Sequence, residues 1–285
     1  MKHLDTFQRF LFDNHQIRGE IVRLDKSYTD IKQRQDYPAP LEALLGEALV
    51  ASVLMSGTLK FEGILSVQAR GDGSVNLLMA ECTHDKKVRA IAQWDGEIPA
   101  DNLTEQLGAA QLAITIDPKQ GKRYQGIVPL EEKKLADCLI HYFEQSEQLS
   151  TYILLFCDGT TASGIFLQQL PTQDKESTDD DAWNRITQFA STVTQEEIHG
   201  LAGEELLNRL FHEEEVTLYP EESIAFECNC SKERTSSALV SLGQDEVYEI
   251  LAEQNIIDIN CQFCNEQYSY QKSDIDELFG NKMLH

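Results

Sequence analysis

Apolar positions between residues 41 and 55 recur at the spacing of an α-helix. The segment reads LEALLGEALVASVLM, and Pro40 before it suits the first turn of a helix. Beyond Gly57 the apolar residues alternate instead, on both sides of a Gly-Asp-Gly turn at 71–73: Leu65, Val67 and Ala69 before it, and Val75, Leu77 and Met79 after it. The pattern predicts a helix over 41–55 followed by an antiparallel hairpin.

The same two periods continue further along the chain. Alternation predicts a second hairpin over 112–128, with its turn at 117–121. Helical spacing returns over 131–145, and strands are predicted near 152–157 and 162–168. Antiparallel sheets with packed helices make the expected fold class α+β, in an N-terminal domain over 1–173.

Residues 171–181 (PTQDKESTDDD) have the composition of a linker, with almost no apolar content. The segment that follows predicts short amphipathic helices, interrupted by Gly200 and Gly203. Their apolar stripes are Trp183, Ile186, Phe189, Ala190 and Val193, and then Leu201, Leu206, Leu207, Leu210 and Phe211. Short, charged helices are marginal in water, so we expect 174–224 to be a helical acidic linker that needs a packing partner.

The last 58 residues predict a small domain with little apolar core. A short strand is expected at Ser223–Phe226, a helical stretch over 238–251 and a further strand over 256–259. Domains of this size usually need a metal ion or disulfides to fold. We therefore expect a small C-terminal domain over 225–285.

The charge of the chain disfavours two classes of partner. The sequence has 24 basic and 48 acidic side chains, a net charge of −24, and residues 174–227 alone carry −12. Such an excess repels phosphate backbones and anionic lipids, so neither nucleic acid nor a membrane surface is an expected partner. Uninterrupted apolar runs stay far below the roughly 20 residues of a membrane span, and the N-terminus lacks the apolar stretch of a signal peptide. A cytoplasmic location is expected.

Seven cysteines in such a chain indicate metal ligands and buried thiols before disulfides. Cys82, Cys138 and Cys157 stand alone in apolar patterns, and we expect them to be buried without a functional role. The other four form a CNC pair and a CQFC pair with 30 residues between them: Cys228, Cys230, Cys261 and Cys264. Two such pairs match tetrahedral thiolate coordination of Zn²⁺, and four thiolates leave no open position for a catalytic water. With no catalytic triad or Walker motif either, an enzyme is not expected.

The spacing of the cysteines leaves several functions open. Each pair can in principle close a local disulfide, which a turn at Asn229 would allow and an extended strand would strain, so the site is either a permanent zinc clip or a reversible switch. A zinc ribbon that binds nucleic acid is a rival, which the net charge of −6 over 228–285 disfavours. A thioredoxin-like thiol oxidoreductase is another rival. Its CxxC motif would open a helix in a βαβ unit, whereas Cys261 and Cys264 follow a predicted strand and precede YSY.

The cysteine pattern closely resembles the zinc centre of the 33 kDa heat shock protein family, the redox-regulated holdase chaperones of bacteria. The most specific match is CNCSKERTSSAL (228–239), followed by QDEVYEILAE and CQFCNEQYSY. Other similar segments are spread over the chain: GTLKFEG (57–63), VQARGDG (67–73), LAITIDPKQGKRYQGIV (112–128), YFEQSEQL (142–149) and LFHEEEVTLY (210–219). One departure is Arg89-Ala90, where the family often has Arg-Gly.

The resemblance implies an inactive, reduced form in which one Zn²⁺ per chain is bound by four thiolates: Cys228, Cys230, Cys261 and Cys264. It also implies an oxidised form, a homodimer with disulfides Cys228–Cys230 and Cys261–Cys264, that holds unfolding client proteins without ATP. Loss of the metal is expected to unfold the C-terminal domain. The acidic helices of 181–212 then lose their packing partner, and the apolar surfaces that they cover become available to clients.

Overall fold

The computed structural model describes residues 5–58, 62–99, 102–171, 179 and 181–280. The chain divides into two compact units, Met1–Glu227 and Cys228–His285. Most of the expected linker at 171–181 lies outside the described residues. The first unit includes both of the expected segments 1–173 and 174–224, and the second unit begins three residues after the expected boundary at 225.

Two sheets organise the first unit. Sheet A consists of β1 (Thr6–Phe12), β2 (Ile17–Leu24), β8 (Thr151–Cys157), β9 (Ala162–Gln169), β10 (Val216–Leu218) and β11 (Glu222–Ser223). Sheet B consists of β3 (Gly63–Arg70), β4 (Val75–Thr83), β5 (Lys87–Trp94), β6 (Gln111–Pro118), β7 (Tyr124–Pro129) and β12 (Ala225–Phe226). The strand orders are β10-β1-β2-β9-β8, with β11 also on β1, and β12-β5-β4-β3-β6-β7. All pairings are antiparallel except that of β12 with β5.

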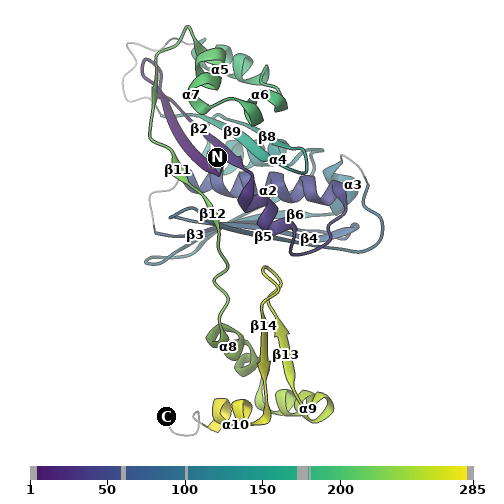
Figure 1. Ribbon diagram of the computed structural model, residues 1–285. Coiled ribbons are helices and arrows are strands. Elements are labelled where there is room, and N and C mark those ends of the chain that lie inside the picture. Colours follow the sequence, from purple (N-terminus) through teal and green to yellow (C-terminus); the bar gives the residue numbers. More distant parts are fainter. Residues whose placement is uncertain (1–4, 59–61, 100–101, 172–178, 180, 281–285) are drawn as a thin grey trace. The chain divides into compact units, whose positions relative to one another are not determined.

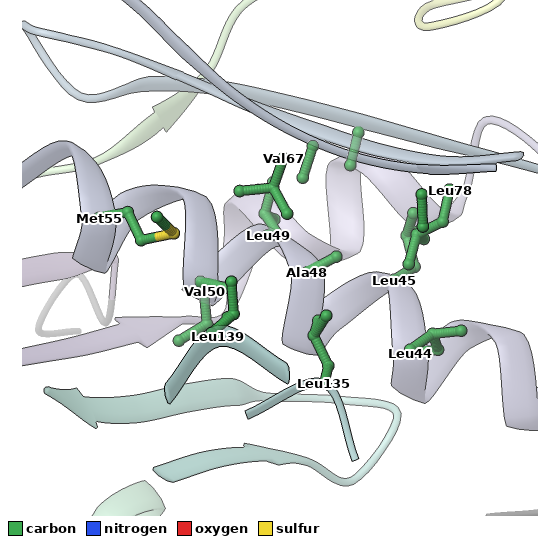
Figure 2. Close-up of a cluster of buried hydrophobic side chains, with 14 of the residues drawn as sticks. Leu44, Leu45, Ala48, Leu49, Val50, Met55, Val67, Leu78, Leu135 and Leu139 are labelled. Carbon is green, nitrogen blue, oxygen red and sulfur yellow. The ribbon is translucent and has the colours of Figure 1, made fainter. Parts of the chain in front are cut away.

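The helices of the first unit lie between and outside these sheets. They are α1 (Lys26–Lys32), α2 (Ala39–Gly57), α3 (Leu103–Leu107), α4 (Leu135–Tyr142), the π-helical η1 (Phe143–Glu147), α5 (Ala182–Ser191), α6 (Gln195–Gly200) and α7 (Gly203–Phe211). Helix α2 lies between sheets A and B (Figure 1). In Figure 2 its Leu45 lies toward Leu78 of sheet B, and its Val50 lies toward Leu139 of α4. The core of the unit is therefore built around one central helix.

Helix α2 is apolar on all sides because it has a sheet on either side of it. By length and composition it is the one helix among the described residues that is long and apolar enough to span a membrane. Its apolar residues do not form one long uninterrupted run, because Glu42, Gly46, Glu47 and Ser52 divide them. In the first unit 72% of this window is buried, as in a core helix.

Helices α5, α6 and α7, named the latch from here on, cover the face of sheet A that points away from α2 (Figure 1). The two predicted apolar stripes face the sheet, with Ile186, Ala190, Val193, Leu206, Leu207, Leu210 and Phe211 buried, and Trp183, Phe189 and Leu201 partly buried. The prediction of amphipathic helices is confirmed. Their described packing partner is sheet A, where Phe211 meets Phe12 edge to face with the ring centroids 5.0 Å apart.

Polar contacts also join the latch to sheet A. The Arg23 guanidinium on β2 donates from Nε to the main-chain oxygen of Ile198 at 3.0 Å, near the end of α6. His15 Nε2, in the turn between β1 and β2, lies 3.0 Å from the carboxylate of Glu214, three residues after the end of α7. Cationic groups at the end of a helix satisfy carbonyl groups that have no partner within the helix. The latch is therefore docked by an apolar face and by polar contacts near the ends of α6 and α7.

Strands β10, β11 and β12, named the strap, lead from the latch to the end of the first unit. β10 and β11 pair with β1, whereas β12 pairs with β5 of the other sheet. Between the last two strands, Ile224 is buried in the main core, and its N–H donates to the main-chain oxygen of Asp5 at 3.0 Å. The single strand predicted at Ser223–Phe226 is thus two short strands that belong to different sheets.

The second unit is small. It consists of α8 (Lys232–Leu242), α9 (Gln244–Gln254), the antiparallel strands β13 (Ile257–Asn260) and β14 (Gln267–Tyr270), and α10 (Lys272–Gly280). Gly243, with a φ of +108°, separates α8 from α9 where one helical stretch was predicted. Its buried core is limited to Leu239, Val247, Leu251, Ile257, Tyr270, Ile275 and Phe279. Seven such side chains agree with the expectation of a thin core.

The α+β fold class is confirmed, and most of the predicted elements are present. The helix over 41–55 and both hairpins form as predicted, as do the strands near 152–157 and 162–168. The helix over 131–145 begins later, at Leu135, and its end widens into η1. Strands β1, β2 and β5 were not predicted. Ala90, at the departure from the family pattern, lies within β5 opposite Ala80.

Candidate metal centre

The four paired cysteines come from two places in the second unit. Cys228 and Cys230 lie in the segment that enters α8, where the Ser231 side chain caps the helix by accepting from the Arg234 N–H at 3.3 Å. Cys261 and Cys264 lie in the turn between β13 and β14. Capping fixes the direction in which the first pair leaves the helix.

Main-chain hydrogen bonds close the CQFC turn. The Cys261 N–H donates to the main-chain oxygen of Glu266, and the Asn265 N–H donates to the main-chain oxygen of Cys261, both at 2.8 Å. Asn265 has a φ of +60°, a left-handed conformation that Asn tolerates better than most residues. These hydrogen bonds hold Cys261 and Cys264 together in one tight turn at the end of the hairpin.

The four sulfur atoms form one cluster. All four Sγ atoms lie within 4.8 Å of one another, and each cysteine is partly buried. Cys228 Sγ is 3.6 Å from Cys261 Sγ, and Cys230 Sγ is 3.3 Å from Cys264 Sγ. Zn–S bonds of about 2.3 Å in a tetrahedron separate sulfurs by about 3.8 Å. Among the described residues this is the only group of three or more potential metal-ligand side chains, and it fits a tetrahedral thiophilic ion such as zinc.

Without a cation, burial works against charge on these sulfurs. Burial raises the pKa of the Cys228 and Cys264 thiols. It acts in the same direction on Cys230, but hydrogen bonds from the Tyr268 hydroxyl and from neighbouring thiols outweigh it and lower the pKa of Cys230. A divalent cation bound by the four cysteines would reverse this balance and favour the thiolate form of its ligands. The donor set is therefore suited to a metal ion.

Two tyrosines of β14 support the cluster, and the sequence analysis did not identify them. The Tyr268 hydroxyl donates to Cys230 Sγ at 3.2 Å, and the Tyr270 hydroxyl donates to the Lys232 oxygen at 2.9 Å. The motif YSY carries a weak signal for this, because alternate residues of a strand lie on the same face. Only the folded structure shows which face that is.

The three isolated cysteines lie in the first unit and are not part of this cluster. Cys82 and Cys138 are buried and Cys157 is partly buried, each within or against the main core. Burial raises the pKa of Cys82 to about 11 and also raises the pKa of the other two thiols. Thiols of this kind are poor nucleophiles near neutral pH.

Comparisons with known proteins agree with this picture. The family model described as Hsp33 protein matches residues 5–271. A 33 kDa chaperonin of Hahella chejuensis is 46% identical over 282 residues, which cover 99% of both chains. One of Pseudomonas fluorescens is 43% identical over 281 residues, which cover 97% of this chain and 94% of the relative.

A solved structure shows the same fold. The crystal structure of the 33 kDa chaperonin from Thermotoga maritima matches with a TM-score of 0.83 and covers 98% of this chain and 99% of its own, at 20% identity. That likeness concerns the fold alone, whereas the relatives near 45% identity carry the family assignment and support a chaperone function. The chain belongs to the Hsp33 family.

Proposed function

We propose that this protein is a redox-regulated, ATP-independent holdase, inactive while its four paired cysteines are reduced and bind one Zn²⁺. The observation that carries the proposal is the cluster of four Sγ atoms, assembled from two segments of a unit with a thin core. A bound Zn²⁺ would link the CNC segment to the CQFC turn, and structural zinc contributes about 10–16 kcal/mol of apparent binding free energy in domains of this kind. The fold of the second unit would then depend on the state of its cysteines.

Oxidation would convert the ligands into groups that do not bind the metal. A thiolate attacks a peroxide oxygen, which gives a sulfenic acid and hydroxide, and a second thiolate then displaces hydroxide from the sulfenic sulfur to form a disulfide. One peroxide accepts the two electrons that the cysteine pair gives up. As the family resemblance implies, we propose the pairs Cys228–Cys230 and Cys261–Cys264. Because each bridge closes a very short loop, it constrains little of the chain and does not replace the metal.

The apolar face under the latch is the surface that we propose for clients. It includes Phe10, Phe12, Ile17, Ile21, Ile165 and Leu167 of sheet A together with the buried stripes of the latch. Exposed apolar patches of this kind bind partly unfolded proteins. The acidic charge of 174–227 would keep the opened form soluble. Activation therefore requires the latch to leave sheet A.

A route from the cysteines to the latch runs along the strap. β12 ends at Phe226, one residue before the end of the first unit, and it pairs with β5 through only two residues. Short terminal pairings open first, so an unfolded second unit favours fraying of β12 and then of β11 and β10. In this proposal 174–224 acts as a helical acidic linker between the N-terminal domain over 1–173 and the redox domain over 225–285.

The remaining parts of the proposal follow the family. We propose a cytoplasmic protein that binds unfolded or partly folded clients, forms a homodimer when oxidised, has no enzymatic activity and does not bind nucleic acid or membranes. The reducing cytoplasm would keep the thiols available for a switch.

The test combines metal content, folding and activity on the full chain. Reduced protein is expected to contain one zinc per chain, visible as anomalous scattering at the zinc edge. Hydrogen exchange should show that peroxide unfolds the second unit. Light scattering should show that a heated client aggregates in the presence of the reduced protein and stays soluble in the presence of the oxidised protein. A reduced, metal-free protein whose second unit remains protected from exchange would contradict the role of the metal. Turnover of a disulfide substrate, or salt-dependent DNA binding, would favour the rival functions.

A further inference from the structure

The strand β14 presents two hydroxyl groups on one face. Tyr268 and Tyr270 are alternate residues of the strand, and Tyr268 is paired with Ile259 of β13. Tyr270 is 1% exposed, and its hydroxyl lies against the first turn of α8, where it donates to the Lys232 oxygen. This contact fixes the distance between the hairpin and the helix that directly follows the CNC segment. The position of Tyr268 is therefore set by strand pairing and by core packing.

The Tyr268 hydroxyl is directed at a sulfur of the cluster. It donates to Cys230 Sγ at 3.2 Å, and the same sulfur lies 3.3 Å from Cys264 Sγ. The donor comes from the hairpin that carries the CQFC turn, whereas the acceptor belongs to the CNC segment. The bond thus joins the two halves of the site independently of any ion. Hydrogen bonds from outside the ligand set orient metal ligands and tune their reactivity.

We propose that Tyr268 is a positioning residue of the metal centre, which holds Cys230 Sγ in place for metal binding and slows its reaction with peroxide. The inference rests on the proposed function, because it requires a metal ion held by the four cysteines. A hydrogen bond to a thiolate draws electron density from the sulfur, and sulfur attack on peroxide depends on that density. In this attack the thiolate forms an S–O bond, the O–O bond breaks and hydroxide leaves. Tyr268 would therefore set the oxidant level at which the switch opens.

The experiment compares Tyr268→Phe with Tyr248→Phe in the full chain. Tyr248 is a matched control in the same unit, because its hydroxyl donates to Asp276 at 2.6 Å and not to a cysteine. Each reduced protein is titrated with Co²⁺, whose thiolate charge-transfer band reports the bound state, and is then mixed with peroxide. We expect Tyr268→Phe to weaken Co²⁺ affinity by about 10- to 100-fold, the usual effect of removing such a supporting group.

Peroxide should also bleach the Co²⁺–thiolate band faster in Tyr268→Phe. An acceleration of about three- to tenfold is expected, because the hydrogen bond withdraws electron density from the sulfur and the nucleophilicity of the sulfur rises when the bond is removed. The charge-transfer band should move to longer wavelength, because a sulfur without this bond gives up an electron more easily. A merely structural defect would not move the band in this way. Tyr248→Phe should match the wild type in all three measurements.

The outcomes separate this inference from the proposed function. A wild-type protein without a Co²⁺–thiolate band would overturn the metal site itself. A wild type that binds Co²⁺ while Tyr268→Phe has the same affinity, peroxide rate and band as Tyr248→Phe would overturn only the role of Tyr268. If Tyr268→Phe does not fold, 3-fluorotyrosine at 268 keeps the ring and makes the hydroxyl a stronger donor. At a pH where its phenol is protonated, this variant should react with peroxide more slowly than the wild type. An unchanged rate would overturn the inference.

Discussion

Ile224, which is buried in the core of the first unit with an exposed fraction of 4%, is separated by only three residues from Cys228, the first cysteine of the sulfur cluster. A connection of three residues therefore joins a buried position of the first unit to the first cysteine of the candidate redox site. The pairings on either side of Ile224, β11 with β1 and β12 with β5, are two residues long each. Among the apolar side chains of 216–226, Ile224 is the one that is buried.

Replacement of this anchor should make activation easier. Ile224→Ala removes a buried side chain and should destabilise the docking of the strap by about 2–5 kcal/mol. We expect client aggregation to be suppressed at lower peroxide or lower temperature, while the zinc content of the reduced form stays the same. Light scattering of a heated client and zinc content give the two measurements.

The control for this variant is Ile256→Ala, the same change at a residue that is 42% exposed in the second unit. A substitution at this exposed position should change the free energy of unfolding by no more than about 0.5 kcal/mol. If Ile224→Ala needs as much oxidant as the wild type, opening does not pass along the strap.

The apolar stripe of the latch gives a second prediction. Leu207→Ala removes a side chain that is 4% exposed against sheet A and should weaken latch docking by about 2–5 kcal/mol. Phe189→Ala should act in the same direction with a smaller effect, because Phe189 is only partly buried. Both variants should suppress client aggregation at lower temperature or with less oxidant.

Asn208→Ala is the control on the same helix, since Asn208 is exposed. Zinc affinity of the reduced form, measured by chelator competition, should be unchanged in all three variants. Folded Leu207→Ala protein that suppresses aggregation no better than Asn208→Ala would mean that the latch does not cover the client surface.

The local sequence pattern was sufficient to predict hairpins, because their paired strands follow one another directly in the sequence. The hairpins β3–β4 and β6–β7 alternate clearly, because one face of each meets α2 or the core. Strand β2 was missed because both of its faces are buried and Arg18, Glu20 and Arg23 interrupt its apolar residues. The latch stripes were predictable from their helical spacing, but their partner is formed by strands from both ends of the N-terminal region. No local pattern specifies such a long-range pairing.

The candidate site shows the same division. The four cysteines of the sulfur cluster could be chosen from spacing alone, since the two members of each pair are close in the sequence. The hydroxyl of Tyr268 could not, because its contact with Cys230 depends on the register of β14 with β13 and on the packing of Tyr270 against α8. Ile224 was predicted only as part of a strand, and its burial depends on two sheets that meet at the end of the strap.

The isolated cysteines give a third prediction. Substitution of Cys82, Cys138 and Cys157 together by Ala should leave peroxide activation intact, because burial raises the pKa of each thiol and disfavours the reactive thiolate. The free energy of unfolding of the first unit should fall, since all three pack in or against its core. Zinc release and client light scattering after peroxide are the measurements. Loss of activation in a variant that is still folded would show that one of the three thiols takes part in the switch.

The last prediction concerns acid. Glu214 lies 2.8 Å from Arg185 Nε and 3.0 Å from His15 Nε2. Burial alone would raise its pKa, but the hydrogen bonds from Arg185 and His15 outweigh burial and hold the pKa below the usual value for a glutamate. A carboxylate whose pKa is lower in the folded state stabilises that state above its unfolded pKa, near 4.3, and loses this contribution as the pH falls through the depressed value. Acid should therefore loosen the latch.

Glu214→Gln isolates this contribution from those of other acidic groups, because it resembles the protonated glutamate at every pH. In a Trp94→Phe background, Trp183 on α5 is the remaining tryptophan and reports latch docking through its fluorescence. Near neutral pH, Glu214→Gln should release the latch at lower guanidinium than the parent protein. The difference between the two midpoints should begin to shrink as the pH falls through the unfolded pKa near 4.3, and should approach zero only below the depressed pKa of Glu214, where its carboxyl is neutral in the folded protein as well. A difference that stays constant while the pH falls well below the unfolded pKa, in protein that still folds, would show that the Glu214 charge does not contribute to latch docking.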